Sequence, residues 1–69
     1  MDSARDAVLR AVRQYAASIF GSVAAADEWL RQPSVVLDGR APIEAIETVE
    51  GHRAVVAELK RIEYERAAK

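Results

Sequence analysis

The sequence predicts an all-α domain, a small bundle of about four helices with a short irregular connection between the second and the third. Apolar residues recur three or four positions apart over most of the chain, as they do on one face of a helix. Alanine, the best helix former, accounts for fourteen of the 69 residues. Turn and cap signals such as Gly21, Pro33 and Asp38-Gly39 stand between these periodic segments. The length allows one small domain.

The first helix is expected over residues 3–19. Its apolar stripe consists of residues spaced four, three and four apart: Val8, Val12, Tyr15 and Ile19. Gly21 follows at the position where many helices end in a left-handed residue, and Ser22 is suited to cap the next helix.

The second helix is expected over residues 23–32 and ends before Pro33, because the residue before a proline avoids the helical region. Its inward face is Val23, Ala26, Trp29 and Leu30. On its outer face Asp27 and Arg31 are four apart and predict an ion pair. Trp29 is interpreted as a core anchor, with an exposed binding hot spot as the alternative.

Residues 33–41 form the connection. Its apolar run Val35-Val36-Leu37 either tucks against the core or forms a short extended edge, and the pattern leaves both open. Asp38-Gly39 predicts a turn, since glycine accepts a positive φ. Pro42 is suited to the first position of a third helix, expected over 42–47.

The last helix is expected over residues 49–67, with Thr48 as its N-cap. Its apolar stripe consists of residues on one helical face: Val55, Val56, Leu59 and Ile62. The two longest predicted helices therefore stand at the two ends of the chain.

Composition narrows the function classes. A net charge of −1 gives no attraction to nucleic acid or to an anionic membrane. No apolar run approaches the about 20 residues that span a bilayer. The N-terminus is unlike a signal peptide, and cysteine is absent, so a cytoplasmic protein without disulfides is expected. His52 is the one histidine, and with no cysteine beside it no metal site or cofactor is expected.

An enzyme is not expected, and no catalytic residue is proposed. The sequence contains no nucleophile–base grouping, and its three glycines are too far apart for a phosphate-binding loop. Glu44 and Glu47 are three apart on a short helix, but a domain this small has little room for a dry pocket that would tune their acidity. A solvated face is the preferred interpretation of this pair.

One ordered set of landmarks resembles a known family, the toxin-binding domain of Xre/MbcA/ParS antitoxins, over roughly residues 12–64. The landmarks are Phe20-Gly21-Ser22, Ala26-x-x-Trp29-Leu30, Pro33, Leu37-x-Gly39-Arg40-x-Pro42, Thr48-x-x-Gly51 and Ile62-Glu63-Tyr64. Each piece occurs in many proteins, whereas the whole order with these gaps is specific. The resemblance assigns structural roles to Phe20, Gly21, Trp29, Leu30, Gly39, Pro42 and Gly51.

The resemblance implies an antitoxin of a bacterial type II toxin–antitoxin system. Its partner would be a RES-domain toxin that consumes NAD or transfers ADP-ribose, and neutralisation would occur by docking on the toxin and blocking its active site. The antitoxin's C-terminal segment would lie closest to the NAD pocket. The expected partner-binding residues are Arg40, Glu63, Tyr64, Arg66 and Lys69. Homo-oligomerisation within the complex is compatible with this hypothesis.

The sequence departs from the family pattern at both ends. Only about a dozen residues precede the family-like core, so residues 1–69 are expected to be a single domain without the N-terminal helix-turn-helix of many members. A DNA-binding role for the second and third helices is also disfavoured, because the connection 33–41 is too long for a helix-turn-helix and the third helix is acidic.

Glu65 stands where the family commonly has glycine, so the last helix is expected to continue through Ala67. The alternative function is a small homodimerising module with no toxin.

Overall fold

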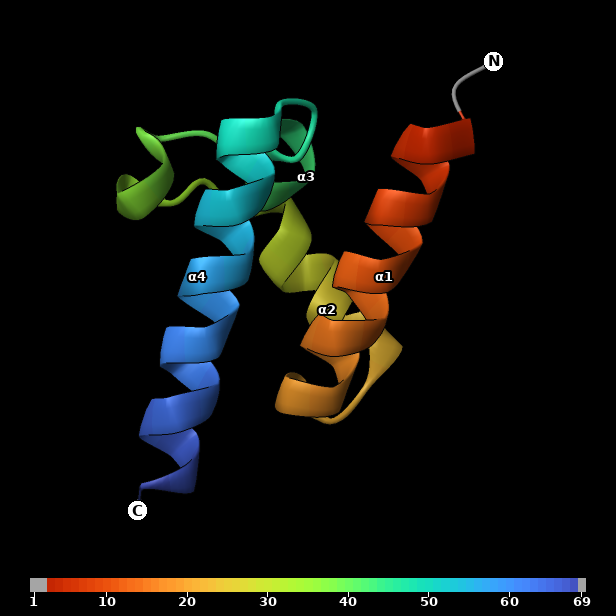
Figure 1. Cartoon of the computed structure of the whole chain (residues 1–69). Helices are drawn as coiled ribbons and strands as arrows, with labels where there is room; N and C mark the ends of the chain where they lie inside the picture. The colour runs from red at the N-terminus through yellow and green to blue at the C-terminus, as the bar shows by residue number, and fades with distance from the viewer. Residues whose placement is uncertain (1–2, 69) are drawn as a thin grey trace.

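The computed structural model describes residues 3–68 and shows an all-α fold, which confirms the predicted class (Figure 1). Its elements are α1 (Ser3–Phe20), α2 (Val23–Arg31), the 3-10 turn η1 (Val35–Leu37), α3 (Pro42–Ala45) and α4 (Val49–Ala67). No residue in this range forms a strand. None of the helices described has the length and apolar character needed to cross a bilayer.

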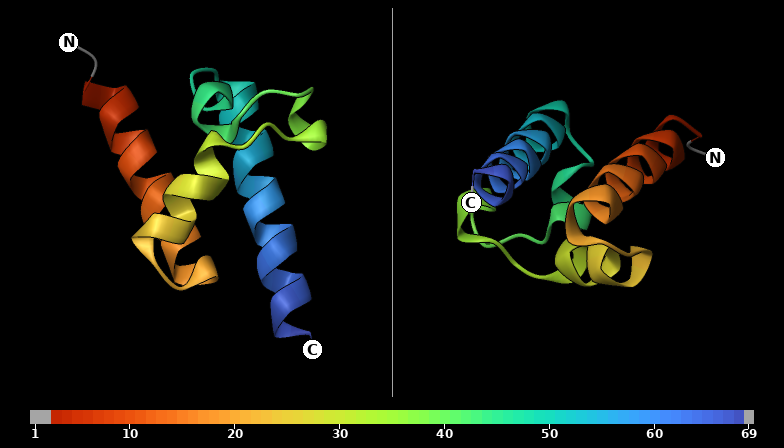
Figure 2. Two further views of the ribbon diagram at one scale, coloured as in Figure 1. Left: turned by 180° about the vertical axis from the view of Figure 1, so that it is seen from behind. Right: turned by 90° about the horizontal axis from the view of Figure 1, so that it is seen from below.

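The two long helices α1 and α4 are farther apart at their N-terminal ends than at their C-terminal ends, and α2 lies between them (Figures 1 and 2). Helix α2 turns back from the end of α1 and leads toward α3, which lies at the N-terminal end of α4. The described chain measures 42 × 24 × 17 Å along its principal axes. The C-terminal end of α4 projects beyond the turn that joins α1 to α2 (Figure 1).

The core is built where the helices meet, from small and medium aliphatic side chains. Its buried members come from all five elements and the turn after α3: Val12, Ala16, Ala26, Leu30, Leu37, Ala45, Ile46, Val55 and Leu59. The buried alanines let the helix backbones approach closely, but each buries little apolar area. The core is consequently compact and thin.

Several predicted core positions are not fully buried. Val23 is 50% exposed, because it is the first residue of α2 and stands outside the helix contacts. Val56 and Ile62 are half-buried, whereas Val55 and Leu59 on the same helix are fully buried. Trp29 lies half-buried against the core, and its ring centroid is 5.9 Å from that of Phe20.

The predicted caps are confirmed. Gly21 has a φ of +95°, and its N–H bonds the Ala17 carbonyl at 2.8 Å. Ser22 Oγ accepts a hydrogen bond from the Ala25 N–H at 3.1 Å, which caps α2. Helix α2 ends at Arg31, one residue before the expected end and two before Pro33.

The connection after α2 is a closed loop. The Ser34 N–H donates to the Arg40 carbonyl at 3.0 Å, and the Gly39 N–H donates to the Ser34 carbonyl at 2.8 Å. Asp38 and Gly39 both have positive φ values, 59° and 81°, so the predicted turn is confirmed and uses two left-handed residues. Within η1 only Leu37 is buried, so the extended edge that the sequence left open does not form.

Helix α3 is shorter than the predicted 42–47 and ends at Ala45. Pro42 occupies its first turn as predicted, and the Glu44 carboxylate accepts a hydrogen bond from the Ala41 N–H at 3.2 Å. The chain tightens after Ala45, because the N–H groups of Glu47 and Thr48 bond the carbonyls three residues back, of Glu44 and Ala45, at 3.3 and 3.4 Å. Thr48 then leaves the helical conformation (φ −115°, ψ 158°) and caps α4 through the Gly51 N–H, at 2.9 Å.

Gly51 is buried where the first turn of α4 meets the end of α3. A Cβ atom at this position would overlap the Ala45 carbonyl oxygen and lie 2.7 Å from the carbonyl carbon. The close approach of two backbones therefore requires glycine here.

Candidate functional site

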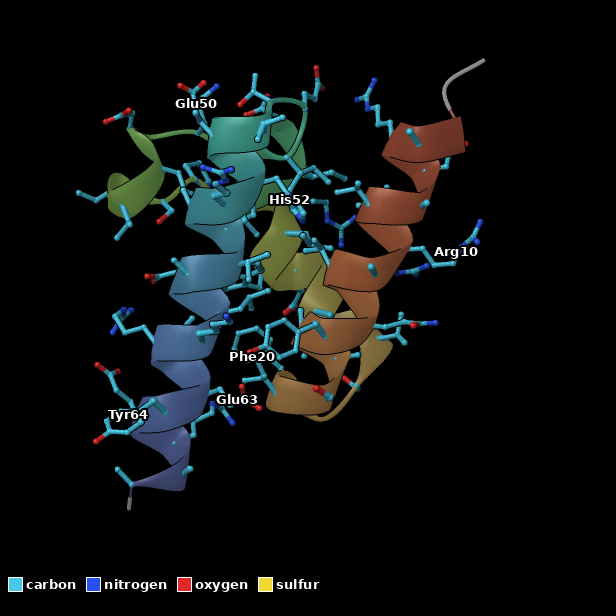
Figure 3. The ribbon with its side chains drawn as sticks, viewed as in Figure 1. Arg10, Phe20, Glu50, His52, Glu63 and Tyr64 are labelled. Carbon is cyan, nitrogen blue, oxygen red and sulfur yellow. The ribbon has the colours of Figure 1, made fainter. Side chains whose placement is uncertain are left out.

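The C-terminal end of α4 carries three of the predicted partner-binding residues, and the structure separates them into two groups (Figure 3). Glu63 faces Phe20 and α1, and its Oε1 accepts a hydrogen bond from the Tyr15 hydroxyl at 2.6 Å. Arg66 also turns inward: Nη1 donates to the Ile19 carbonyl at 3.3 Å. These two side chains hold α4 against the end of α1.

Arg66 has a second internal contact. Its guanidinium carbon lies 5.3 Å from the centroid of the Phe20 ring, within the range of a cation–π interaction. Phe20 in turn contacts Trp29. The family-like landmarks Phe20 and Trp29 thus form a small aromatic support, which sequence periodicity alone did not connect to the end of α4.

Tyr64 belongs to the other group, since it points away from α1 and is 76% exposed. It lies near the C-terminal end of α4, about level with the α1–α2 turn (Figure 3). An exposed tyrosine on a regular helix combines apolar area with a hydroxyl and loses little conformational entropy on binding. Lys69, the last predicted member, lies outside the described residues.

Arg40 lies apart from this end of α4. It is exposed on the loop that follows η1, which sits beside the N-terminal half of α4 (Figure 1). Its backbone is held by hydrogen bonds to Ser34 and Leu37, and its guanidinium forms no ion pair with the other residues that the structure describes. The predicted site residues therefore lie on two separate regions of the surface.

Two exposed valines accompany Arg40, and sequence reasoning did not identify them as surface residues. Val35 is 94% exposed and Val36 is 61% exposed, although the loop that carries them is closed by backbone hydrogen bonds. Leu37 anchors the loop in the core. A three-residue apolar run has no periodicity that would reveal which of its members turns inward.

The ion pair predicted between Asp27 and Arg31 is replaced by a contact between helices. The Arg13 guanidinium donates two hydrogen bonds to the Asp27 carboxylate, at 2.8 and 2.9 Å. This bidentate pair joins α1 to α2. The hydrogen bonds from Arg13 lower the pKa of the Asp27 carboxyl below its ordinary value.

A second charge cluster lies along α4. Arg61 bonds Glu58 through Nε and Nη2, at 3.0 and 2.7 Å, and Glu65 through Nη1 at 2.7 Å. The hydrogen bonds from Arg61 lower the pKa of Glu58. Glu65 thus takes part in a helical ion-pair network, and α4 continues through Ala67 as expected.

These carboxyl groups predict an acid-sensitive fold. A group whose pKa is lower in the folded state stabilises that state above its ordinary pKa, and this stabilisation is lost as the pH falls through the folded value. We therefore expect the melting temperature to fall as the pH drops below about 4, near the ordinary carboxyl values. Asp27→Asn should melt lower than the parent protein at pH 7 and lose less on acidification, as measured by circular dichroism. Glu28→Gln, on the same helix without an ion pair in the described structure, is the control and should retain the parental pH profile.

The described residues contain no group of three or more His, Cys, Asp or Glu side chains arranged to hold a metal ion. What the surface offers is an exposed aromatic helix end, an apolar loop tip and several charged side chains. Such features are suited to contact with another macromolecule.

The sequence matches one known family over most of its length. Residues 16–64 match the sequence profile described as the antitoxin Xre/MbcA/ParS C-terminal toxin-binding domain. The chain belongs to this family. The matched range contains the last five residues of α1, all of α2 and α3 and most of α4, so the exposed Tyr64 and all of the buried core except Val12 fall within it.

A curated protein also resembles this toxin-binding domain. The 6-hydroxy-3-succinoylpyridine 3-monooxygenase HspA of Pseudomonas putida (strain DSM 28022 / S16) is 41% identical over 49 residues. The alignment covers 71% of the present chain and 16% of the relative, so the chain spans a small part of that protein. Comparison with solved structures gives no match.

Proposed function

We propose that this chain is the antitoxin of a type II toxin–antitoxin system and neutralises a RES-domain toxin. It would bind the toxin, an enzyme that consumes NAD or transfers ADP-ribose, and block access to the active site. The observation that carries the proposal is membership of a toxin-binding family over residues 16–64. The RES-domain target follows from the resemblance of the landmark residues to those antitoxins whose partners are RES toxins.

The projecting end of α4 is the part best suited to enter a concave site. Tyr64 stands on a helix whose inward side is tied to α1 by Glu63 and Arg66, so the tyrosine is presented on a supported element. Preorganisation of this kind lowers the entropy cost of binding. Inhibition would be steric and would require no chemical step on the antitoxin.

The loop carrying Arg40 supplies a second contact region in this proposal. Val35 and Val36 would provide apolar area, and Arg40 a charged contact at its edge. Interfaces commonly combine a few apolar anchors with a charged rim. We propose no enzymatic activity for the chain, since the monooxygenase relative is matched over only 16% of its length.

Co-expression tests the function directly. The chain is produced together with the protein encoded by the adjacent reading frame of its native genome, the complex is purified, and NAD consumption is measured with and without the chain. We expect a RES-type protein to co-purify and its NAD loss to be suppressed. If nothing co-purifies, NAD is unaffected and the chain elutes as a dimer in size-exclusion chromatography, the homodimerising alternative replaces the antitoxin function.

Tyr64→Ala tests the role of the projecting helix end. Truncation of a central aromatic contact commonly costs more than about 1 kcal/mol, so we expect the toxin to bind at least about fivefold more weakly. Circular dichroism should show an unchanged fold, because Tyr64 is 76% exposed. Val23→Ala, which truncates an exposed apolar side chain on α2, is the matched control and should leave affinity unchanged. Equal affinities of both variants and the parent protein would remove Tyr64 from the interface.

A further inference from the structure

A groove of about 390 Å³ lies between α1, α2 and α3. Its apolar lining consists of Leu9, Leu30 and Ile43, one residue from each helix. Leu30 is buried, whereas Leu9 and Ile43 are half-buried, so part of this apolar lining is open to solvent. The groove offers a place for one aliphatic side chain.

Charged side chains surround this lining, and most of them are basic. Arg13 is already occupied by Asp27 through two hydrogen bonds. Arg10 and Arg31 also line the groove and are exposed. Neither forms a direct ion pair with a residue that the structure describes, although the charge of Arg31 helps to lower the pKa of Asp27.

The groove is separate from the projecting end of α4. Arg10 points from α1 away from α4, whereas Tyr64 lies on α4 on the side away from α1 (Figure 3). A partner that touches both regions would therefore contact two faces of the domain.

We infer that this groove binds an acidic segment of the partner protein, with an aliphatic side chain between Leu9, Leu30 and Ile43 and carboxylates on Arg10 and Arg31. The inference rests on the proposed function for the identity of the partner, the toxin. Arginine suits this role because its planar guanidinium binds a carboxylate through two parallel hydrogen bonds. A partly enclosed groove also strengthens such contacts relative to open water.

The same residues argue against a nucleic-acid ligand. Asp6 and Asp27 line the groove among the arginines and would repel a phosphate backbone. The chain carries a net charge of −1, which provides no long-range attraction to a polyanion. The two aspartates also repel carboxylates, but a short segment that contacts only Arg10 and Arg31 carries far less negative charge into the groove than a phosphate backbone does.

The first experiment tests the ligand chemistry without the toxin. The probe is a synthetic helical peptide with one leucine flanked by glutamates one turn away on each side, and its control has lysines in place of the glutamates. Binding is followed by NMR of the Leu9, Leu30 and Ile43 methyl groups. We expect saturable shifts of these methyls with the acidic peptide only. Arg10→Glu combined with Arg31→Glu should weaken binding at least about tenfold.

The second experiment uses the complex with the adjacent-frame protein. Arg10→Glu/Arg31→Glu should weaken it at least about tenfold at low salt, and the neutral Arg10→Gln/Arg31→Gln variant should have a smaller effect of the same sign. Arg53→Glu/Lys60→Glu on α4 makes the same change in net charge and is the control. We expect less than about a threefold change for this control, because charge effects on solvated residues are screened.

The outcomes separate this inference from the proposed function. If the neighbour binds the parent protein and the Arg10→Glu/Arg31→Glu variant equally well, or binds both double variants equally poorly, the groove is not the contact and the antitoxin function stands. If the peptide binds but the neighbour does not bind the parent protein, the groove's preference for acidic segments stands and the toxin partner is wrong. Absence of peptide-induced shifts, or methyl shifts that depend on protein concentration alone, overturns the inference, the latter in favour of a second copy of the chain.

Discussion

Replacement of Gly51 by alanine should strongly destabilise the fold. The added Cβ would overlap the Ala45 carbonyl, which is backbone and cannot rotate away as a flexible side chain would. The overlap can be removed only if α4 moves away from α3. This movement would disturb the Thr48 cap and the burial of Ile46 beside it. Overpacking costs typically about 1–3 kcal/mol, and a backbone clash belongs at the upper end or above it.

The gain in helix propensity from glycine to alanine, about 1 kcal/mol, does not offset this clash. A domain of this size has a total stability of roughly 3–10 kcal/mol, so the variant should be partly or wholly unfolded at 37 °C. Urea denaturation followed by circular dichroism measures the loss. Gly39→Ala is the control: its Cβ meets nothing within 4 Å, and only the cost of a φ of +81° remains. A Gly51→Ala variant as stable as Gly39→Ala would contradict the close packing of α3 and α4.

Leu59→Ala should also remove a large part of the free energy of unfolding, in this case through a cavity in the core. Leu59 is fully buried, and it is the last fully buried side chain along α4. Truncation of a buried leucine to alanine typically costs about 2–5 kcal/mol, as lost transfer energy and a residual cavity. In a domain with such a small core few other side chains can move to fill the space.

The measurement is again the free energy of unfolding, with the thermal midpoint as a second readout. Each kcal/mol lowers the midpoint of a 60–100-residue domain by about 4–8 °C, so a fall of at least about 8 °C is expected. Val49→Ala on the same helix is the matched control, because Val49 is 70% exposed and should change stability by less than about 0.5 kcal/mol. Similar midpoints for the two variants would mean that Leu59 is not part of a packed core.

Local chemistry explains why the sequence predicts the helix borders well. Ser22 bonds a backbone N–H three residues later, Thr48 does the same, and Gly21 needs only its own left-handed conformation. Pro42 begins a helix for reasons contained in its own ring. The family-like landmarks are largely such residues, which is why their order could be recognised in the sequence.

The sequence did not predict which of the proposed partner-binding side chains are turned toward the rest of the domain. The sequence placed Glu63, Tyr64 and Arg66 at one helix end, but the rotation of α4 against α1 determines that Glu63 and Arg66 turn inward and Tyr64 outward. The same holds for Val35 and Leu37, which are only two residues apart in the chain: Val35 is 94% exposed and Leu37 is 4% exposed.

By itself the sequence determined the all-α class, the four helices, their caps and the family, because each depends on interactions within a few residues or on an ordered motif. Only the tertiary structure decided the partners of Arg13 and Arg66, the need for glycine at position 51 and the groove beside Arg10. These features join residues far apart in the chain, and they exist only once the helices have a definite rotation and crossing. Packing of the apolar stripes sets that geometry, and a single-helix pattern does not contain it.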